Sequence, residues 1–166
     1  MKPSRTLLAA ILVPVFLAAR PAGAAAQPSD ALGIRITGNI NAAIDYPGAG
    51  AELSYQHFFG PGTRIEIDLG ARIHDYLPGQ RKVHPDAMLA TSFQWRWPMG
   101  RRAGFYAGPA VQFGRPDYGL GVGAQAGFDW YSDGPLQLSI DVRPTCNWFL
   151  YEHFDACLGV GLRYTF

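Results

Sequence analysis

The chain has 166 residues, a formal net charge of +1, and 16% charged against 48% hydrophobic residues. Soluble domains usually contain ~25% charged residues, so the charge content is low. A nucleic-acid-binding protein needs a clustered basic face, which this sequence lacks, and we therefore expect no nucleic-acid partner.

The first 26 residues have the pattern of a secretory signal peptide. Lys2 and Arg5 precede an apolar run over 7–19, and the small residues of 22–26 end in an A-x-A site. A basic start, a short apolar run and a small-residue cleavage site, in this order, are typical of secretory signal peptides. The run is shorter than the ~20 residues of a spanning helix, which leaves an uncleaved anchor helix as the weaker alternative.

Cleavage after Ala26 gives the predicted domain organisation. A short tail over 27–32 precedes a single domain over 33–166. The leader carries three basic and no acidic residues, so the mature chain keeps 11 basic against 13 acidic residues. Its net charge is therefore about −2 rather than +1.

The mature chain alternates apolar and polar residues with a period of two. This period is typical of β-strands with one apolar face. Eight segments share it: 34–45, 52–57, 64–74, 89–97, 105–113, 120–130, 136–143 and 157–166. Short Gly- and Pro-containing turns separate them, so neighbouring strands should be antiparallel. We predict an all-β fold, an eight-stranded antiparallel up-and-down barrel that crosses a membrane.

Alternation alone does not say which face of the barrel is inside. A soluble lipocalin-like barrel would place the apolar face inward. However, the apolar set has more large members than an eight-stranded interior can hold. Glycines on the polar face would also make room in a crowded interior. We therefore predict lipid outside and polar residues inside, with the soluble ligand-binding barrel as an alternative.

The polar face predicts an interior network of ion pairs. Charges kept from water must be paired, because an uncompensated one costs several kcal/mol. The predicted network consists of Arg35, Glu52, Arg64, Glu66, Asp68, Arg72, Arg96, Asp129, Asp141, Arg143 and Arg163. Eight strands leave no wide channel, which favours structural filling over an ion or solute pathway.

Aromatic residues gather near the ends of the predicted strands. Membrane proteins favour such residues at the two membrane interfaces. The predicted belts consist of Tyr46, Phe58, Tyr76, Trp95, Trp97, Trp130, Trp148 and Tyr164.

The last segment is the most specific motif. Its apolar positions are Leu158, Val160, Leu162, Tyr164 and the final residue, Phe166. This pattern resembles the terminal strand of small eight-stranded outer-membrane barrels, the group of the OmpA transmembrane domain and OmpX. The resemblance implies that barrel-assembly machinery reads these five residues as an assembly signal. It also implies location in the outer membrane of a Gram-negative cell envelope, with outer-membrane lipid and lipopolysaccharide as partners. The oligomeric state is open, with a monomer favoured.

The sequence offers no convincing catalytic or metal site. Some barrels of this size modify or bind lipid A, which makes such a protein the alternative function. A serine nucleophile would need a base within about 3 Å, yet Ser54, Ser92 and Ser139 have no histidine two positions away on their own strand face. His74-Asp75 and Glu152-His153-x-Asp155 lack a third ligand at a regular spacing. We predict a structural protein with no catalysis, no cofactor and no metal.

Two further features remain open at this stage. Cys146 and Cys157 flank the last outer loop, and strict alternation places them on opposite faces. A bulge at Pro144 would restore the match and permit a disulfide; otherwise they are separate small apolar fillers. The longest predicted outer loop, 77–87, carries Arg81, Lys82 and His84, which could contact lipopolysaccharide phosphates.

Overall fold

The computed structural model describes residues 29–41, 47–60, 62–77, 80–115, 119–147 and 153–166. The predicted leader lies outside these ranges, as do Tyr46 and Trp148 of the predicted belts. The described residues form eight strands: β1 (Asp30–Asn41), β2 (Pro47–Phe58), β3 (Thr63–Leu77), β4 (Gln80–Pro98), β5 (Ala103–Arg115), β6 (Gly119–Tyr131), β7 (Leu136–Asn147) and β8 (His153–Thr165).

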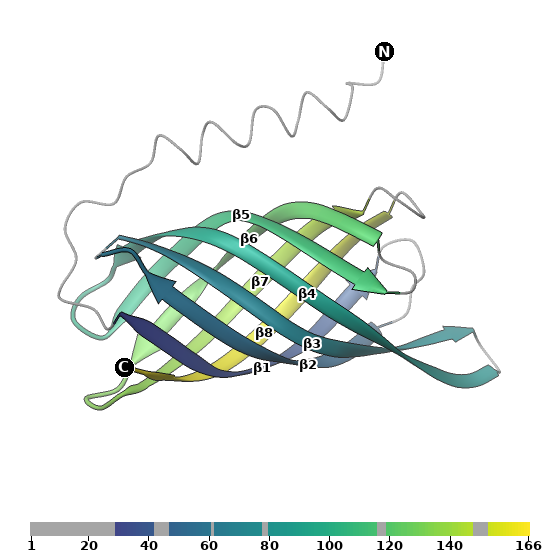
Figure 1. Cartoon of the computed structure of the whole chain (residues 1–166), viewed down its shortest axis with the longest axis horizontal. Coiled ribbons are helices and arrows are strands. Elements are labelled where there is room, and N and C mark those ends of the chain that lie inside the picture. Colours follow the sequence, from purple (N-terminus) through teal and green to yellow (C-terminus); the bar gives the residue numbers. More distant parts are fainter. Residues whose placement is uncertain (1–28, 42–46, 61, 78–79, 116–118, 148–152) are drawn as a thin grey trace, which may run out of the picture.

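The strands close into one up-and-down antiparallel barrel (Figure 1). Each strand pairs with the next along the chain, and β1 closes the barrel by pairing with β8. The predicted fold class is therefore confirmed. In the described part of the chain, no helix has both the length and the apolar character needed to span a membrane.

The first and last described residues meet at one end of the barrel, on the seam between β1 and β8. We call this the termini end. The backbone N–H of Asp30 donates to the carbonyl of Phe166 at 3.0 Å, and the N–H of Phe166 donates back to Asp30 at 2.9 Å. The turn between β4 and β5 also lies here, where Gly100 adopts the left-handed region with a φ of 81°. Glycine suits this position because it carries no Cβ that would clash.

At the opposite end β3 and β4 extend beyond their neighbours as a projecting hairpin (Figure 1). Pairing of β2 with β3 ends at Ala49 and Ile73, and pairing of β4 with β5 ends at Ala87 and Arg115. The predicted loop over 77–87 is thus wrong for most of its length, because β4 already begins at Gln80. Residues 80–87 lack a clean apolar alternation, so their sequence pattern does not predict a strand.

The two faces of the strands differ sharply in exposure and chemistry. Ile36 is 65% exposed whereas its neighbour Arg35 is fully buried, and Ile140 is 57% exposed beside Asp141 at 3%. Large apolar side chains point outward on all eight strands, while arginines, carboxylates and glutamines point inward. This arrangement is inconsistent with the lipocalin-like alternative, which needs the apolar face inside.

Candidate functional site

All eleven residues of the predicted interior network lie inside the barrel, each no more than 4% exposed. They come from seven of the eight strands and form three neighbouring clusters along the barrel. Each cluster joins strands that are distant along the chain.

The cluster nearest the projecting hairpin is centred on Arg35 and Glu52. Arg35 on β1 donates to Glu52 on β2 at 2.5 Å and forms an ion pair with Asp141 on β7. Arg143 pairs with Asp68, and both lie beside this group. Because charges from opposite walls meet, the cluster spans the cross-section of the interior.

Arg72 extends the same cluster toward the hairpin end. Its guanidinium lies 3.1 Å from the carboxylate of Asp155 on β8 and 3.6 Å from that of Glu52. Asp155 was not predicted as an interior residue, although it shares the parity of Cys157 and Gly159 on β8. Extending the alternation of the last segment by one step would have found it.

The middle cluster is centred on Glu66. One oxygen of its carboxylate accepts from Arg163 on β8 at 3.0 Å, and the other accepts from Gln56 at 2.6 Å. Arg163 also donates to Ser54 at 2.9 Å and to Ser139 at 2.6 Å. These two serines therefore serve as hydrogen-bond acceptors for the buried guanidinium of Arg163.

The cluster at the termini end contains Arg64 and Asp129, which form an ion pair of 2.6 Å. The guanidinium of Arg64 also lies 4.2 Å from the centre of the Tyr106 ring. Arg96 approaches Asp129 at 3.5 Å and the Tyr131 ring at 4.6 Å. Because Arg64 and Arg96 share the carboxylate of Asp129, these cation–π contacts add to the attraction that each guanidinium receives.

The interior holds more polar residues than the eleven of the predicted ion-pair network. With Asp86 and Asp155, seven buried carboxylates face six buried arginines among the described residues. Tyr106 and five glutamines complete the network: Gln56, Gln94, Gln112, Gln125 and Gln137. Asp86 was missed because it fell within the predicted outer loop.

Glycines make the space that the arginines occupy. A Cβ added at Gly159 would overlap the guanidinium of Arg35. At Gly104, a Cβ would lie 2.9 Å from Nε of Arg96, closer than real Cβ contacts. Interior glycine is therefore a packing requirement of these long side chains.

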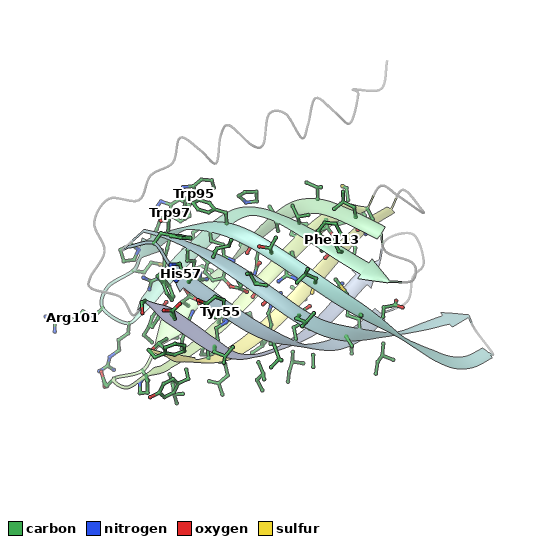
Figure 2. All side chains as sticks on the ribbon, viewed as in Figure 1. Tyr55, His57, Trp95, Trp97, Arg101 and Phe113 are labelled. Carbon is green, nitrogen blue, oxygen red and sulfur yellow. The ribbon has the colours of Figure 1, made fainter. Side chains whose placement is uncertain are left out.

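The predicted belts are only partly where we expected them. Trp130 and Tyr164 point outward, at 61% and 56% exposed, and Trp97 is half-buried at the outer surface. Figure 2 shows Trp95 and Trp97 near the termini end of the barrel. The side chain of Tyr76 lies outside the described residues.

One belt assignment needs correction, and a second belt residue is less exposed than we expected. Phe58 is 7% exposed and faces the interior, where its ring lies 5.8 Å from the guanidinium of Arg64. It has the same parity as Gln56, so strict alternation would have placed it inside. Trp95 is on the outward face but only 5% exposed; Ala107, opposite in the register, leaves room for the indole.

The cysteines are both free, so the disulfide that the sequence left open is not formed. Cys146 is exposed opposite Phe154, whereas Cys157 is buried opposite Arg143. The register between β7 and β8 runs without interruption past Pro144, so no bulge brings the two faces together. Instead, regular pairing with β6 is interrupted between Gly123 and Ala126, on the other edge of β7.

The five residues of the terminal motif all point outward on β8. Their side chains are between 48% and 59% exposed: Leu158, Val160, Leu162, Tyr164 and Phe166. This apolar stripe lies at the seam where β8 meets β1.

The described residues show no arrangement of a nucleophile with a base. Ser92 accepts from Gln94 at 2.6 Å, and the other two barrel serines contact Arg163. His57 contacts Asp30 at 2.9 Å at the rim. The described part of the chain also has no group of three residues placed to hold a metal ion. The side chains of His74, His84 and His153 lie outside the described residues.

The geometry defines a class of fold: an eight-stranded barrel with an apolar exterior and a charged interior, which is the architecture of small transmembrane barrels. No family model and no curated protein sequence matches the chain. Solved structures do resemble it, at 11% sequence identity in each case.

One similar structure is Neisserial surface protein A (NspA), with a TM-score of 0.65 over 86% of this chain and 100% of that one. A de novo designed transmembrane β-barrel matches with a TM-score of 0.58, over 85% and 98% of the two chains. Ail, the attachment invasion locus protein of Yersinia pestis, matches with a TM-score of 0.50, over 84% and 98%. At identities this low, the structural similarity establishes the shared fold alone.

Proposed function

We propose that this protein is a small structural outer-membrane barrel whose interior is filled by ion pairs and which has no catalytic activity. The observation that carries the proposal is the exposure of large apolar side chains around the whole barrel. Twenty-five large hydrophobic side chains are exposed among the described residues. Such a surface in water would aggregate, whereas hydrocarbon solvates it.

The interior supports a structural role over transport. The three clusters place arginine–carboxylate pairs across the barrel at successive depths. An eight-stranded barrel has an interior just wide enough for side chains to fill. We therefore expect no steady conductance when the purified protein is added to planar bilayers, and persistent open channels would contradict the filled interior.

The proposal for export and assembly rests on two sequence patterns, the leader pattern over 1–26 and the alternating apolar motif of β8. The leader over 1–26 directs secretion and is removed, and the β8 motif ending in Phe166 is recognised by barrel-assembly machinery. Outer-membrane lipid and lipopolysaccharide then surround the barrel as its partners. The similar natural proteins, Neisserial surface protein A and the attachment invasion locus protein of Yersinia pestis, support the outer-membrane location.

The membrane location is tested by fractionation and by electrophoresis with and without boiling. A folded barrel migrates differently from the boiled chain and sediments with outer membranes. A mature protein recovered in the soluble periplasmic fraction would overturn the proposal. Lipid A mass spectra from cells with and without the gene test the absence of lipid A modification, and we expect identical profiles.

A further inference from the structure

The turn between β4 and β5 carries a cation that the rest of the described molecule does not neutralise. Arg102 forms an exposed ion pair of 2.5 Å with Asp133 of the β6–β7 turn. Its neighbour Arg101 is also exposed, and no carboxylate among the described residues pairs with it. Figure 2 shows Arg101 extending away from the termini end of the barrel.

The register places Arg101 just beyond the outward-facing aromatic residues. Trp130 is level with Ala103, and the N–H of Tyr131 donates to the carbonyl of Arg102 at 2.7 Å. Arg101 therefore lies two positions past the level of Trp130, at most ~7 Å along the strand direction. The headgroup layer on each side of a bilayer is ~5–8 Å thick. A barrel with Trp130 at the interface would hold Arg101 among the lipid headgroups.

The residues around Arg101 suit a lipid surface rather than open water. Met99 in the same turn is 59% exposed, and Trp130 is 61% exposed. Apolar side chains beside an unpaired guanidinium can enter the acyl boundary while the cation stays with the phosphates. Arginine also binds phosphate through two parallel N–H donors, which favours it over a point charge.

We propose that the β4–β5 turn is a binding site for the headgroup of an anionic phospholipid, with Arg101 contacting the phosphate and Met99 and Trp130 contacting the acyl boundary. The site rests on the membrane location proposed above. It lies at the termini end, opposite the projecting hairpin, so it faces the leaflet on the side where the two chain ends meet. Asp133 limits the contribution of Arg102 by holding it in an ion pair.

Quenching of tryptophan fluorescence by brominated lipids tests the site. The mature chain is folded into vesicles that contain either brominated phosphatidylglycerol or brominated phosphatidylcholine in a background of the unbrominated lipids. We expect phosphatidylglycerol to quench with a relative binding constant about three- to fivefold higher at low salt. The preference should fall in 1 M NaCl, where the Debye length is ~3 Å.

Four variants test which side chain causes the preference for phosphatidylglycerol. Arg101→Gln should abolish most of it, and Arg102→Gln should reduce it less, because Arg102 is already paired. Asp133→Asn should increase it by releasing Arg102. Arg101→Lys keeps the charge and should retain part of the preference.

The outcomes separate this site from the membrane location itself. Equal quenching by both lipids, or a preference that survives Arg101→Gln unchanged, would overturn the headgroup site but leave the barrel in the membrane. Absence of quenching by either lipid in vesicles would overturn both proposals.

Discussion

Arg163 on β8 donates to Glu66 on β3 at 3.0 Å, although the two residues lie 97 positions apart in the sequence. The same carboxylate accepts from Gln56 on β2 and from Gln125 on β6. Four strands therefore meet at one side chain, so the middle of the barrel is held together by a shared acceptor as well as by its backbone ladders.

Replacing Glu66 should destabilise the barrel strongly. Glu66→Gln leaves Arg163 buried without its charge partner, and removing one member of a buried pair costs about 3–5 kcal/mol. Urea unfolding in lipid vesicles measures the loss. The double variant Glu66→Gln/Arg163→Met should be more stable than the sum of the two single changes predicts. Additive losses would show that the pair is not coupled.

Ile67→Arg tests the outward face one position further along β3. Ile67 is 39% exposed and lies between the outward residues Ile65 and Leu69. An arginine at the bilayer midplane costs ~2–4 kcal/mol, whereas near the interface it costs ~0–1 kcal/mol. Phe59→Arg, in the β2–β3 turn, is the matched control for depth. Equal stability of the parent and Ile67→Arg in lipid vesicles would disprove the assignment of the outward face to lipid.

Gly159→Ala should disrupt the Arg35 cluster. The added Cβ would overlap the guanidinium of Arg35, which must then leave its positions against Glu52 and Asp141. We expect a loss of about 1–3 kcal/mol, as for other overpacked interiors. Gly38→Ala is the control, because its Cβ would meet only a carbonyl oxygen at 3.9 Å. Similar losses in both variants would point to a general effect of replacing strand glycine.

Deleting Phe166 should affect assembly in cells more than stability in vitro. The deletion removes the backbone bonds of Phe166 to Asp30 and one outward aromatic side chain, which contributes at most the ~1.5–3 kcal/mol of a fully buried one. If machinery reads the terminal motif, the truncated chain should be depleted from the outer membrane while still folding from urea into detergent. Normal outer-membrane levels of the truncated protein would refute the role of Phe166 as a signal.

Both cysteines should remain as thiols in the folded protein. Cys146 and Cys157 point to opposite sides of the β7–β8 ladder, which a disulfide cannot cross without movement of the backbone. Alkylation after denaturation without reductant, followed by mass spectrometry, should add two labels per chain. A chain that takes up labels only after reduction would show that the register differs from the one described.

The sequence alone determined the strand count, the order of the strands and the identity of the two faces. Leu158, Val160, Leu162 and Tyr164 are informative because successive side chains of a strand point to opposite faces. Alternating residue types therefore reveal which side chains share a face, whichever strands lie next to them. The eleven charged residues of the predicted interior were placed by the same rule. Phe58 and Asp155 obey it as well. Phe58 was assigned to a belt by residue type instead of parity, and Asp155 was missed because the alternation of the last segment was not extended to it.

Only the tertiary structure decided which strands bring their charges together. Closure of β1 on β8 and the stagger of the strands place Arg163 beside Glu66, Arg64 beside Asp129 and Arg35 between Glu52 and Asp141. These contacts depend on the registers of several ladders at once, and local alternation is the same for every register shifted by two residues. The continuous pairing past Pro144 and the projection of β3 and β4 are likewise properties of strand pairing, which no single segment of the sequence encodes by itself.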